Sequence, residues 1–174
     1  MKKIGIFYGP MGGSTEAVAN KVAGLIGEDK CSVKAVSQAS VNDLFAFDNI
    51  IFGIATIGNE TWNSDPLQSG WFTFVNDLEK AEISNKTIAM FGLGDHIRYA
   101  DHFVDALGEL NRILSQKDVR LVGRVDAADY TFRESKALVG DEFVGLPIDE
   151  DFEPSLTDDR IKQWVGDILK EFNQ

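Results

Sequence analysis

The chain has 174 residues, a hydrophobic fraction of 44% and a formal net charge of −11 at pH 7. This length is typical of one domain whose core is large enough to need neither disulfides nor a structural metal. The excess of 28 acidic over 17 basic residues argues against nucleic acid or an anionic membrane as a partner, because like charges repel. The same excess favours docking onto basic surfaces of other proteins.

The chain shows no sign of a targeting or membrane segment. No apolar run approaches the ~20 residues that cross a bilayer, and Met1-Lys2-Lys3 leads directly into a predicted strand. We therefore expect a cytoplasmic protein, and we expect it to be a monomer. The single cysteine, Cys31, has no Cys or His companion at metal-ligand spacing, so we expect a thiol in the core.

Short apolar runs of strand character alternate with helical patterns along the chain. The predicted strands cover residues 3–8, 32–36, 49–54, 86–91 and 119–122, with further strand character at 143–146. The predicted helices cover residues 15–27, 37–47 and 99–115, a stretch opened by Pro66 that passes through 71–78, and a final helix capped by Thr157. The alternation predicts a doubly wound α/β sheet with helices on both faces, forming one domain over residues 1–174.

Three predicted loops leave the carboxyl ends of strands and differ from plain connectors. They cover residues 9–14, 55–65 and 92–98. In open α/β sheets, ligands bind beyond the carboxyl ends of the strands, at the point where the strand order switches. We therefore expect these three loops to converge on one binding site.

The first of these loops has the composition of a phosphate cup. It reads Gly9-Pro10-Met11-Gly12-Gly13-Ser14 and precedes a helical pattern that starts at Thr15. Glycines let the backbone turn tightly and point N–H groups inward, and a helix N-terminus adds partial positive charge. Neither the dinucleotide fingerprint nor the nucleoside-triphosphate loop is present. The pattern favours one phosphate held without a cationic side chain; the alternative is a tight turn that binds nothing.

Motifs further along make the chain resemble the flavodoxins, specifically their long-chain group. These motifs are Gly92-Leu93-Gly94-Asp95 with Tyr99-Ala100-Asp101, Ser135–Leu138, Phe143–Leu146, and Ile148–Asp151 running into Leu156–Ile161. The resemblance covers essentially the whole chain. It implies a flavodoxin-like fold with a five-stranded parallel sheet, a polar loop at about 124–141 that splits the last strand, and one FMN bound without a covalent bond.

The resemblance implies that the first loop wraps the FMN phosphate, with a departure from the family pattern. The family usually has Thr-x-Thr-Gly-x-Thr, of which Gly13 and Thr15 match, whereas Pro10 and Gly12 replace two residues that carry hydroxyl groups. Proline also brings no N–H of its own. Because hydrogen bonds to a charged group are worth about 1.5–3 kcal/mol each, we expect weaker phosphate binding unless Ser14 compensates.

The second loop is expected to cover the inner face of the isoalloxazine. Thr56 matches the family, and Ile57 follows it at the position that contacts the ring. The Gly58-Asn59 peptide corresponds to one that flips to hydrogen-bond the half-reduced flavin in the family. Trp62 either folds over the ring, presents an apolar patch to a partner, or packs on its own loop.

Of the three loops, the third matches the flavodoxin pattern best. The resemblance places the Asp95 carboxylate as acceptor of the flavin N3–H and the backbone of Leu93 or Gly94, which follow Gly92, at the pyrimidine edge. Tyr99 is expected to stack on the outer face of the ring, a contact worth about 1 kcal/mol beyond its buried area.

Charged residues near this loop leave alternatives open. Arg98 places a cation at a position that is usually apolar or acidic, where it either stabilises the reduced flavin or pairs with Asp95 or Asp101. Asp151 is a candidate for the ribityl chain, while Asp149–Asp151 as a whole is expected to form an acidic surface.

The resemblance implies a low-potential one-electron carrier rather than an enzyme. In an acidic protein, burial of the ring disfavours extra negative charge on it. This lowers the potential of the second one-electron reduction. The implied partners are redox proteins such as ferredoxin–NADP reductase or a 2-oxoacid:flavodoxin oxidoreductase, with nitrogenase also open. Two alternatives remain, namely an FMN-dependent reductase of small acceptors with a cleft near Trp62, and a flavodoxin-like module whose FMN binding is weak or lost.

Overall fold

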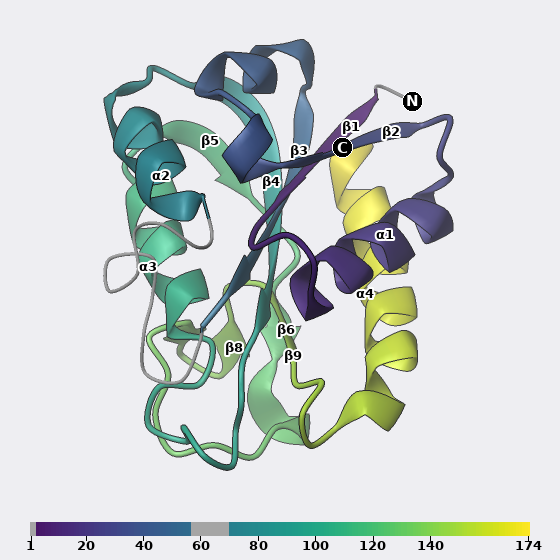
Figure 1. Ribbon diagram of the computed structural model, residues 1–174, viewed down its shortest axis with the longest axis vertical. Coiled ribbons are helices and arrows are strands. Elements are labelled where there is room, and N and C mark those ends of the chain that lie inside the picture. The colour runs from purple at the N-terminus through teal and green to yellow at the C-terminus, as the bar shows by residue number, and fades with distance from the viewer. Residues whose placement is uncertain (1–2, 57–69) are drawn as a thin grey trace.

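The computed structural model describes residues 3–56 and 70–174, and its centre is a parallel sheet (Figure 1). The strands run in the order β2-β1-β3-β4-β5, and all neighbours are parallel. Their bounds are β1 (Ile4–Tyr8), β2 (Cys31–Ala35), β3 (Asn49–Ala55), β4 (Ser84–Leu93) and β5 (Asp118–Leu121). The predicted five-stranded parallel sheet is therefore confirmed.

Helices cover both faces of the sheet, as expected of a doubly wound fold. Figure 1 shows α1 (Ser14–Ile26) and α4 (Thr157–Phe172) on one face and α2 (Trp71–Lys80) and α3 (Asp105–Leu114) on the other. Every residue of β1 is buried. The central strands read as continuous apolar runs because both of their faces lie against helices.

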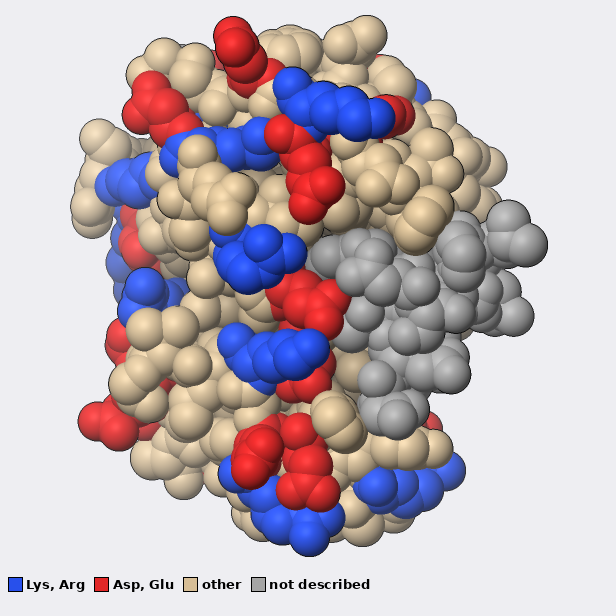
Figure 2. Space-filling model, turned by 90° about the vertical axis from the view of Figure 1, so that its left-hand side faces the viewer, with Lys and Arg blue, Asp and Glu red and all other residues tan. Residues whose placement is uncertain are grey.

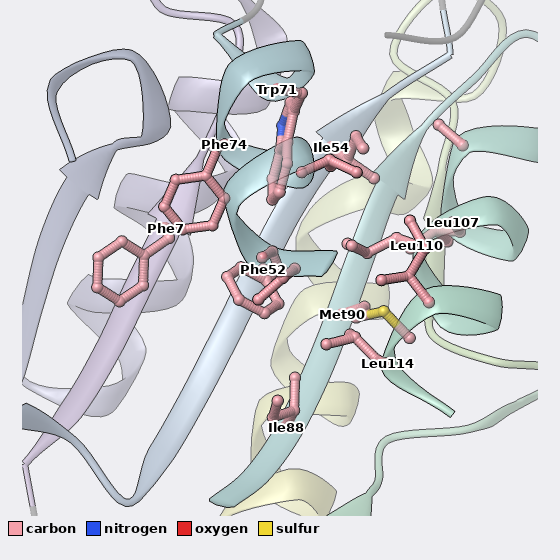
Figure 3. Close-up of a cluster of buried hydrophobic side chains, with 14 of the residues drawn as sticks. Phe7, Phe52, Ile54, Trp71, Phe74, Ile88, Met90, Leu107, Leu110 and Leu114 are labelled. Carbon is pink, nitrogen blue, oxygen red and sulfur yellow. The ribbon is translucent and has the colours of Figure 1, made fainter. Parts of the chain in front are cut away.

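Each face of the sheet has its own apolar core. Figure 3 shows the larger one, in which Phe52 of β3 lies against Trp71 and Phe74 of α2, while the leucines of α3 face Met90 of β4. The ring centroids of Phe52 and Trp71 are 5.7 Å apart, with an interplanar angle of 74°. This edge-to-face packing holds α2 against β3.

Two separate segments pair with β4 along one edge of the sheet. β5 pairs with the first half of β4, whereas the short strand β9 (Leu146–Ile148) pairs in parallel with its end, where Phe91 lies opposite Leu146. Between them the chain forms a small antiparallel sheet in the order β6-β8-β7, with β6 at Val125–Asp126, β7 at Leu138–Val139 and β8 at Glu142–Phe143. The polar segment thus leaves the sheet edge, and the chain returns to the same edge beside the end of β4.

Two predicted helices differ from the structure. The helix expected over 99–115 begins only at Asp105, because the Ala100 carbonyl accepts the N–H groups of Arg133 and Glu134 and the backbone at Val104 is left-handed, with φ 49°. The helix expected over 37–47 is replaced by two 3₁₀-helices, η1 (Val36–Gln38) and η2 (Val41–Ala46).

Of three further expectations, one is wrong, one lies outside the described residues and one is confirmed. Thr157 is the first residue of α4 rather than its cap, and its hydroxyl donates to the Glu150 carboxylate instead. Pro66 lies outside the described residues, within which α2 begins at Trp71. Cys31 is a core thiol as expected, 5% exposed, and its burial raises the pKa of the thiol.

Over residues 3–56 and 70–174, no helix combines the length and the apolar composition needed to span a bilayer.

Candidate functional site

A cavity of 350 Å³ lies at the carboxyl-terminal edge of the sheet, a volume within the range of small-molecule and cofactor sites. The loop after β1, the end of β3, the loop after β4 and the segment after β9 all contribute to its wall. The lining residues are Pro10, Ser14, Thr15, Ala55, Thr56, Leu93, Gly94, Asp95, Arg98, Tyr99, Glu150 and Asp151. The structure therefore brings the first and third predicted loops to one site.

Not every residue predicted for the site lines this cavity. Gly9, Gly12 and Gly13 belong to the first loop but are not among the lining residues. Met11 is 48% exposed, and its sulfur lies 3.4 Å from the Ser37 hydroxyl.

At Gly92, an added Cβ would lie 2.5 Å from the Leu107 side chain, so this glycine serves the contact between β4 and α3. The predictions for Ile57, Gly58, Asn59 and Trp62 lie outside the described residues. They stay predictions.

The first loop is tied to its surroundings at Gly9. Its N–H donates to the Gly53 carbonyl at 3.1 Å, and its carbonyl accepts the indole N–H of Trp71 at 3.2 Å. Three residues later, Gly12 has a left-handed backbone with φ 81°, a conformation that is strained for residues with a side chain. A threonine at position 12 would therefore need a different loop backbone, so the missing hydroxyl and the loop conformation go together.

The loop offers several hydrogen-bond donors without a cation. Within the described part of the chain, the backbone N–H groups of Gly13, Ser14 and Thr15 donate to no acceptor, as expected at the start of a helix. Thr15 is 2% exposed and lines the cavity, and its hydroxyl has no partner in that part of the chain. Residues 9–16 include no Lys or Arg. Neutral donors and the positive end of α1 can thus hold a phosphate here.

The third loop is organised around Asp95, which is 6% exposed. Its Oδ1 accepts the N–H groups of Ile97 at 3.0 Å and Arg98 at 2.7 Å, and its Oδ2 accepts from Arg98 Nε at 2.5 Å. Arg98 also lies 3.3 Å from the Asp151 carboxylate, whereas Asp101 pairs with Arg133. Of the two expected partners, Arg98 therefore takes Asp95 and not Asp101, and hydrogen bonding to Asp95 raises the pKa of the guanidinium.

The expectation that Asp149 belongs to an acidic surface is wrong. Asp149 is 1% exposed, and its Oδ2 lies 2.5 Å from Nδ1 of His96. The same carboxylate accepts the backbone N–H groups of His96, Asp151 and Phe152 at 2.9–3.0 Å. Burial alone would raise the pKa of Asp149, but these hydrogen bonds outweigh it and lower the pKa.

The pair formed by His96 and Asp149 therefore fastens the third loop to the segment after β9. A further anchor is the Thr56 hydroxyl, which accepts the Ala106 N–H at 2.9 Å and ties the end of β3 to the start of α3. Tyr99, which is 39% exposed, also lines the cavity. Tyr99 is thus partly accessible to a ligand.

Three contributors were missed among the predicted site residues. Ala55 and Glu150 line the cavity, and Glu16 accepts the Gly12 N–H at 2.6 Å. Glu150 could have been found from its neighbour Asp151, and Ala55 from its place at the carboxyl end of a predicted strand. The signal for Glu16 was an acidic side chain in the first turn of a helix, where carboxylates are favoured.

Comparison with known proteins decides the family. The sequence model of the flavodoxin family matches residues 6–164. The chain belongs to the flavodoxin family. A flavodoxin from Nostoc sp. is 44% identical over 171 residues, which are 98% of each chain, and one from Synechococcus elongatus is 40% identical over 173 residues, 99% of each.

A solved structure extends the comparison to three dimensions. The crystal structure of Fusobacterium nucleatum flavodoxin bound to flavin mononucleotide matches this flavodoxin with a TM-score of 0.88 and 26% identity, over 99% of each chain. The resemblance drawn from the sequence motifs is therefore confirmed at the level of family and fold.

The anchoring role of Asp149 gives a prediction with a defined pH dependence. Replacing Asp149 with Asn should lower the free energy of unfolding by about 1–3 kcal/mol at pH 7, because charged hydrogen bonds are lost. Since the folded-state pKa of Asp149 is lowered, its carboxylate stabilises the fold above the unfolded-state pKa of about 3.9, and this contribution disappears as the pH falls through the folded-state value.

The measurement is urea unfolding of the two proteins between pH 7 and acidic pH. The difference between wild type and Asp149→Asn should be largest at neutral pH and shrink below about pH 4. Asp141→Asn is the matched control, because Asp141 is exposed and its side chain makes no hydrogen bond within the described part of the chain. A difference that stays constant over the whole pH range would contradict the assigned role.

Proposed function

We propose that this flavodoxin is a low-potential one-electron carrier that holds FMN non-covalently in the cavity and passes electrons between redox proteins. The observation that carries the proposal is the meeting of a cation-free phosphate loop with the Asp95–Tyr99 loop around one cavity at the carboxyl edge of the sheet. The related Fusobacterium nucleatum protein, described as bound to flavin mononucleotide, supports it. Bound FMN supplies the redox chemistry, and the protein supplies its position and electrostatic surroundings.

The first loop is the proposed phosphate site. The N–H groups of Gly13, Ser14 and Thr15 and the Thr15 hydroxyl are free to donate within the described chain. Pro10 and Ser14 line the same end of the cavity. The remaining members of the loop are proposed to shape its backbone: Gly9, Met11 and Gly12.

The third loop is the proposed ring site. Asp95 has its carboxylate held in place by two backbone N–H groups, which leaves it oriented to accept the N3–H of the ring. Leu93 and Gly94 bring backbone to the same wall, Tyr99 offers an accessible ring for stacking, and Asp151 lies where it can meet the ribityl chain. Gly92 acts through its packing on α3. On the opposite side of the ring, Thr56 and the predicted residues Ile57, Gly58, Asn59 and Trp62 complete the proposal.

The charges around the cavity support a low potential. Its wall includes the carboxylates of Asp95, Glu150 and Asp151 and a single guanidinium, that of Arg98. Arg98 is shared between Asp95 and Asp151, so its charge is largely compensated before a ligand arrives. Adding an electron to a ring in negative surroundings raises the free energy of the product, which lowers the reduction potential.

The surface favours docking of partners at the cavity rim. Figure 2 shows acidic and basic side chains interleaved on the described part of the face that carries α2 and α3. The rim instead has exposed apolar side chains, namely Ile97, Tyr99 and Phe152. We propose redox proteins with basic docking surfaces as partners, such as ferredoxin–NADP reductase or a 2-oxoacid oxidoreductase, and a cytoplasmic, monomeric, single-domain carrier.

Stepwise anaerobic reduction of the purified protein, followed by its absorption spectrum, tests the function. A one-electron carrier should be coloured as isolated and should accumulate the blue, one-electron-reduced flavin partway through the titration. Direct passage from the oxidised to the fully reduced spectrum would favour the FMN-dependent reductase. A protein that stays colourless after FMN is added would favour the module that has lost FMN binding.

Tyr99 tests the proposed ring site separately. Replacing it with Ala should raise the Kd for FMN about tenfold, because the stacking contact and its buried area are lost. Tyr99→Phe should change the Kd by less than about threefold, since the ring is kept. Ile97→Ala is the matched control, because Ile97 is exposed two residues away and does not line the cavity.

Fluorescence titration of the apoprotein with FMN gives these constants. Equal affinities for wild type and Tyr99→Ala would remove Tyr99 from the site.

A further inference from the structure

The phosphate loop already contains a negative charge that belongs to the chain itself. Glu16 is the third residue of α1, and its Oε2 accepts the backbone N–H of Gly12 at 2.6 Å. This distance is short even for a hydrogen bond to a carboxylate. One of the N–H groups of the first loop is thus occupied by an internal anion.

The negative charge of the same carboxylate also acts on the buried end of β1. Tyr8, the last residue of that strand, is 6% exposed. Burial, then the negative charge of Glu16 and a hydrogen bond to it, raise the pKa of the Tyr8 phenol. The Glu16 side chain folds back toward the loop, where the Gly12 N–H is its hydrogen-bond donor.

This charge is not compensated locally. Within residues 3–56 and 70–174, Glu16 forms no ion pair with Lys, Arg or His, and the loop itself contains no basic residue. The Gly13, Ser14 and Thr15 N–H groups that remain free lie next to it in the chain. A dianionic phosphate bound by those groups would sit close to a like charge, which opposes its binding.

We propose that Glu16 acts as a built-in competitor for the phosphate and thereby sets how strongly this flavodoxin prefers FMN over riboflavin. The inference rests on the proposed FMN function and concerns the phosphate end of that site. FMN must either displace the carboxylate from the Gly12 N–H or accept the neighbouring charge. Riboflavin has the same ring and ribityl chain but no phosphate, so Glu16 does not oppose it.

Glu16→Gln is the informative variant, because the amide oxygen can still accept the Gly12 N–H while the charge is removed. The charge control is Glu82→Gln, since Glu82 is exposed just before β4, at the end of the sheet opposite the cavity. The Kd values of the apoproteins for FMN and for riboflavin are measured by quenching of flavin fluorescence.

Glu16→Gln should lower the Kd for FMN about tenfold and change that for riboflavin less than about twofold, and the gain should shrink as salt is raised. Glu82→Gln should leave both constants within about twofold of wild type. An unchanged or weaker affinity of Glu16→Gln for FMN, or a parallel change for both flavins, would overturn the inference, because Glu16 would then only support the loop. If no variant binds either flavin, the proposed function itself fails, and this inference fails with it.

A second measurement does not involve flavin. Inorganic phosphate at a fixed concentration should raise the Tm of the Glu16→Gln apoprotein more than that of wild type, with chloride at equal ionic strength as the reference. Equal increases for the two proteins would count against competition at the loop.

Discussion

A corner of free backbone N–H groups, without a basic side chain, is the constraint on which the proposed site depends. The corner between β1 and α1 offers unpaired N–H groups and the positive end of a helix dipole. Such a corner can form only if the backbone turns through conformations that side chains resist, as Gly12 does with its φ of 81°. The composition of the loop and its geometry therefore go together, and the proposed binding of a phosphate depends on both.

The rest of the fold holds the other walls of the cavity in place around that corner. β4 is the key element, because its first half pairs with β5 and its end pairs with β9. The loop after β4 is thus held against the segment after β9, and the buried pair of His96 and Asp149 fastens the two together. The aromatic packing of Phe52, Trp71 and Phe74 holds α2 against β3 (Figure 3). Trp71 also reaches the first loop through the Gly9 carbonyl.

Much of this could be predicted from the sequence, for identifiable reasons. Strands buried on both faces read as apolar runs, so the five strands of the central sheet were predicted to within two residues at each end. The strand character predicted at 143–146 falls instead on the end of β8 and the start of β9. Residues 99–104 were expected to be helical but are not. The Ala100 carbonyl accepts the N–H groups of Arg133 and Glu134, which lie far along the chain. No local pattern reports such bonds.

The candidate site was predicted less completely than the fold, again because of long-range contacts. Asp149 was expected on the surface, as acidic residues usually are, yet three backbone N–H groups and His96 make its burial favourable. Pairing of Arg98 with Asp95 was one of the alternatives left open, but its sharing between Asp95 and Asp151 depends on how two loops meet. The contact of Glu16 with Gly12 could be found only once the loop backbone was known.

The most direct test of the central claim is a nuclear magnetic resonance titration of the ¹⁵N-labelled apoprotein with FMN and, separately, with riboflavin. The account predicts that the amide protons of Gly13, Ser14 and Thr15 shift strongly downfield with FMN and little with riboflavin, because only FMN brings a phosphate for them to bind. The amide of Asp95 and its neighbours should shift with both flavins. Equal shifts of the first-loop amides with the two flavins, or none with FMN, would contradict it.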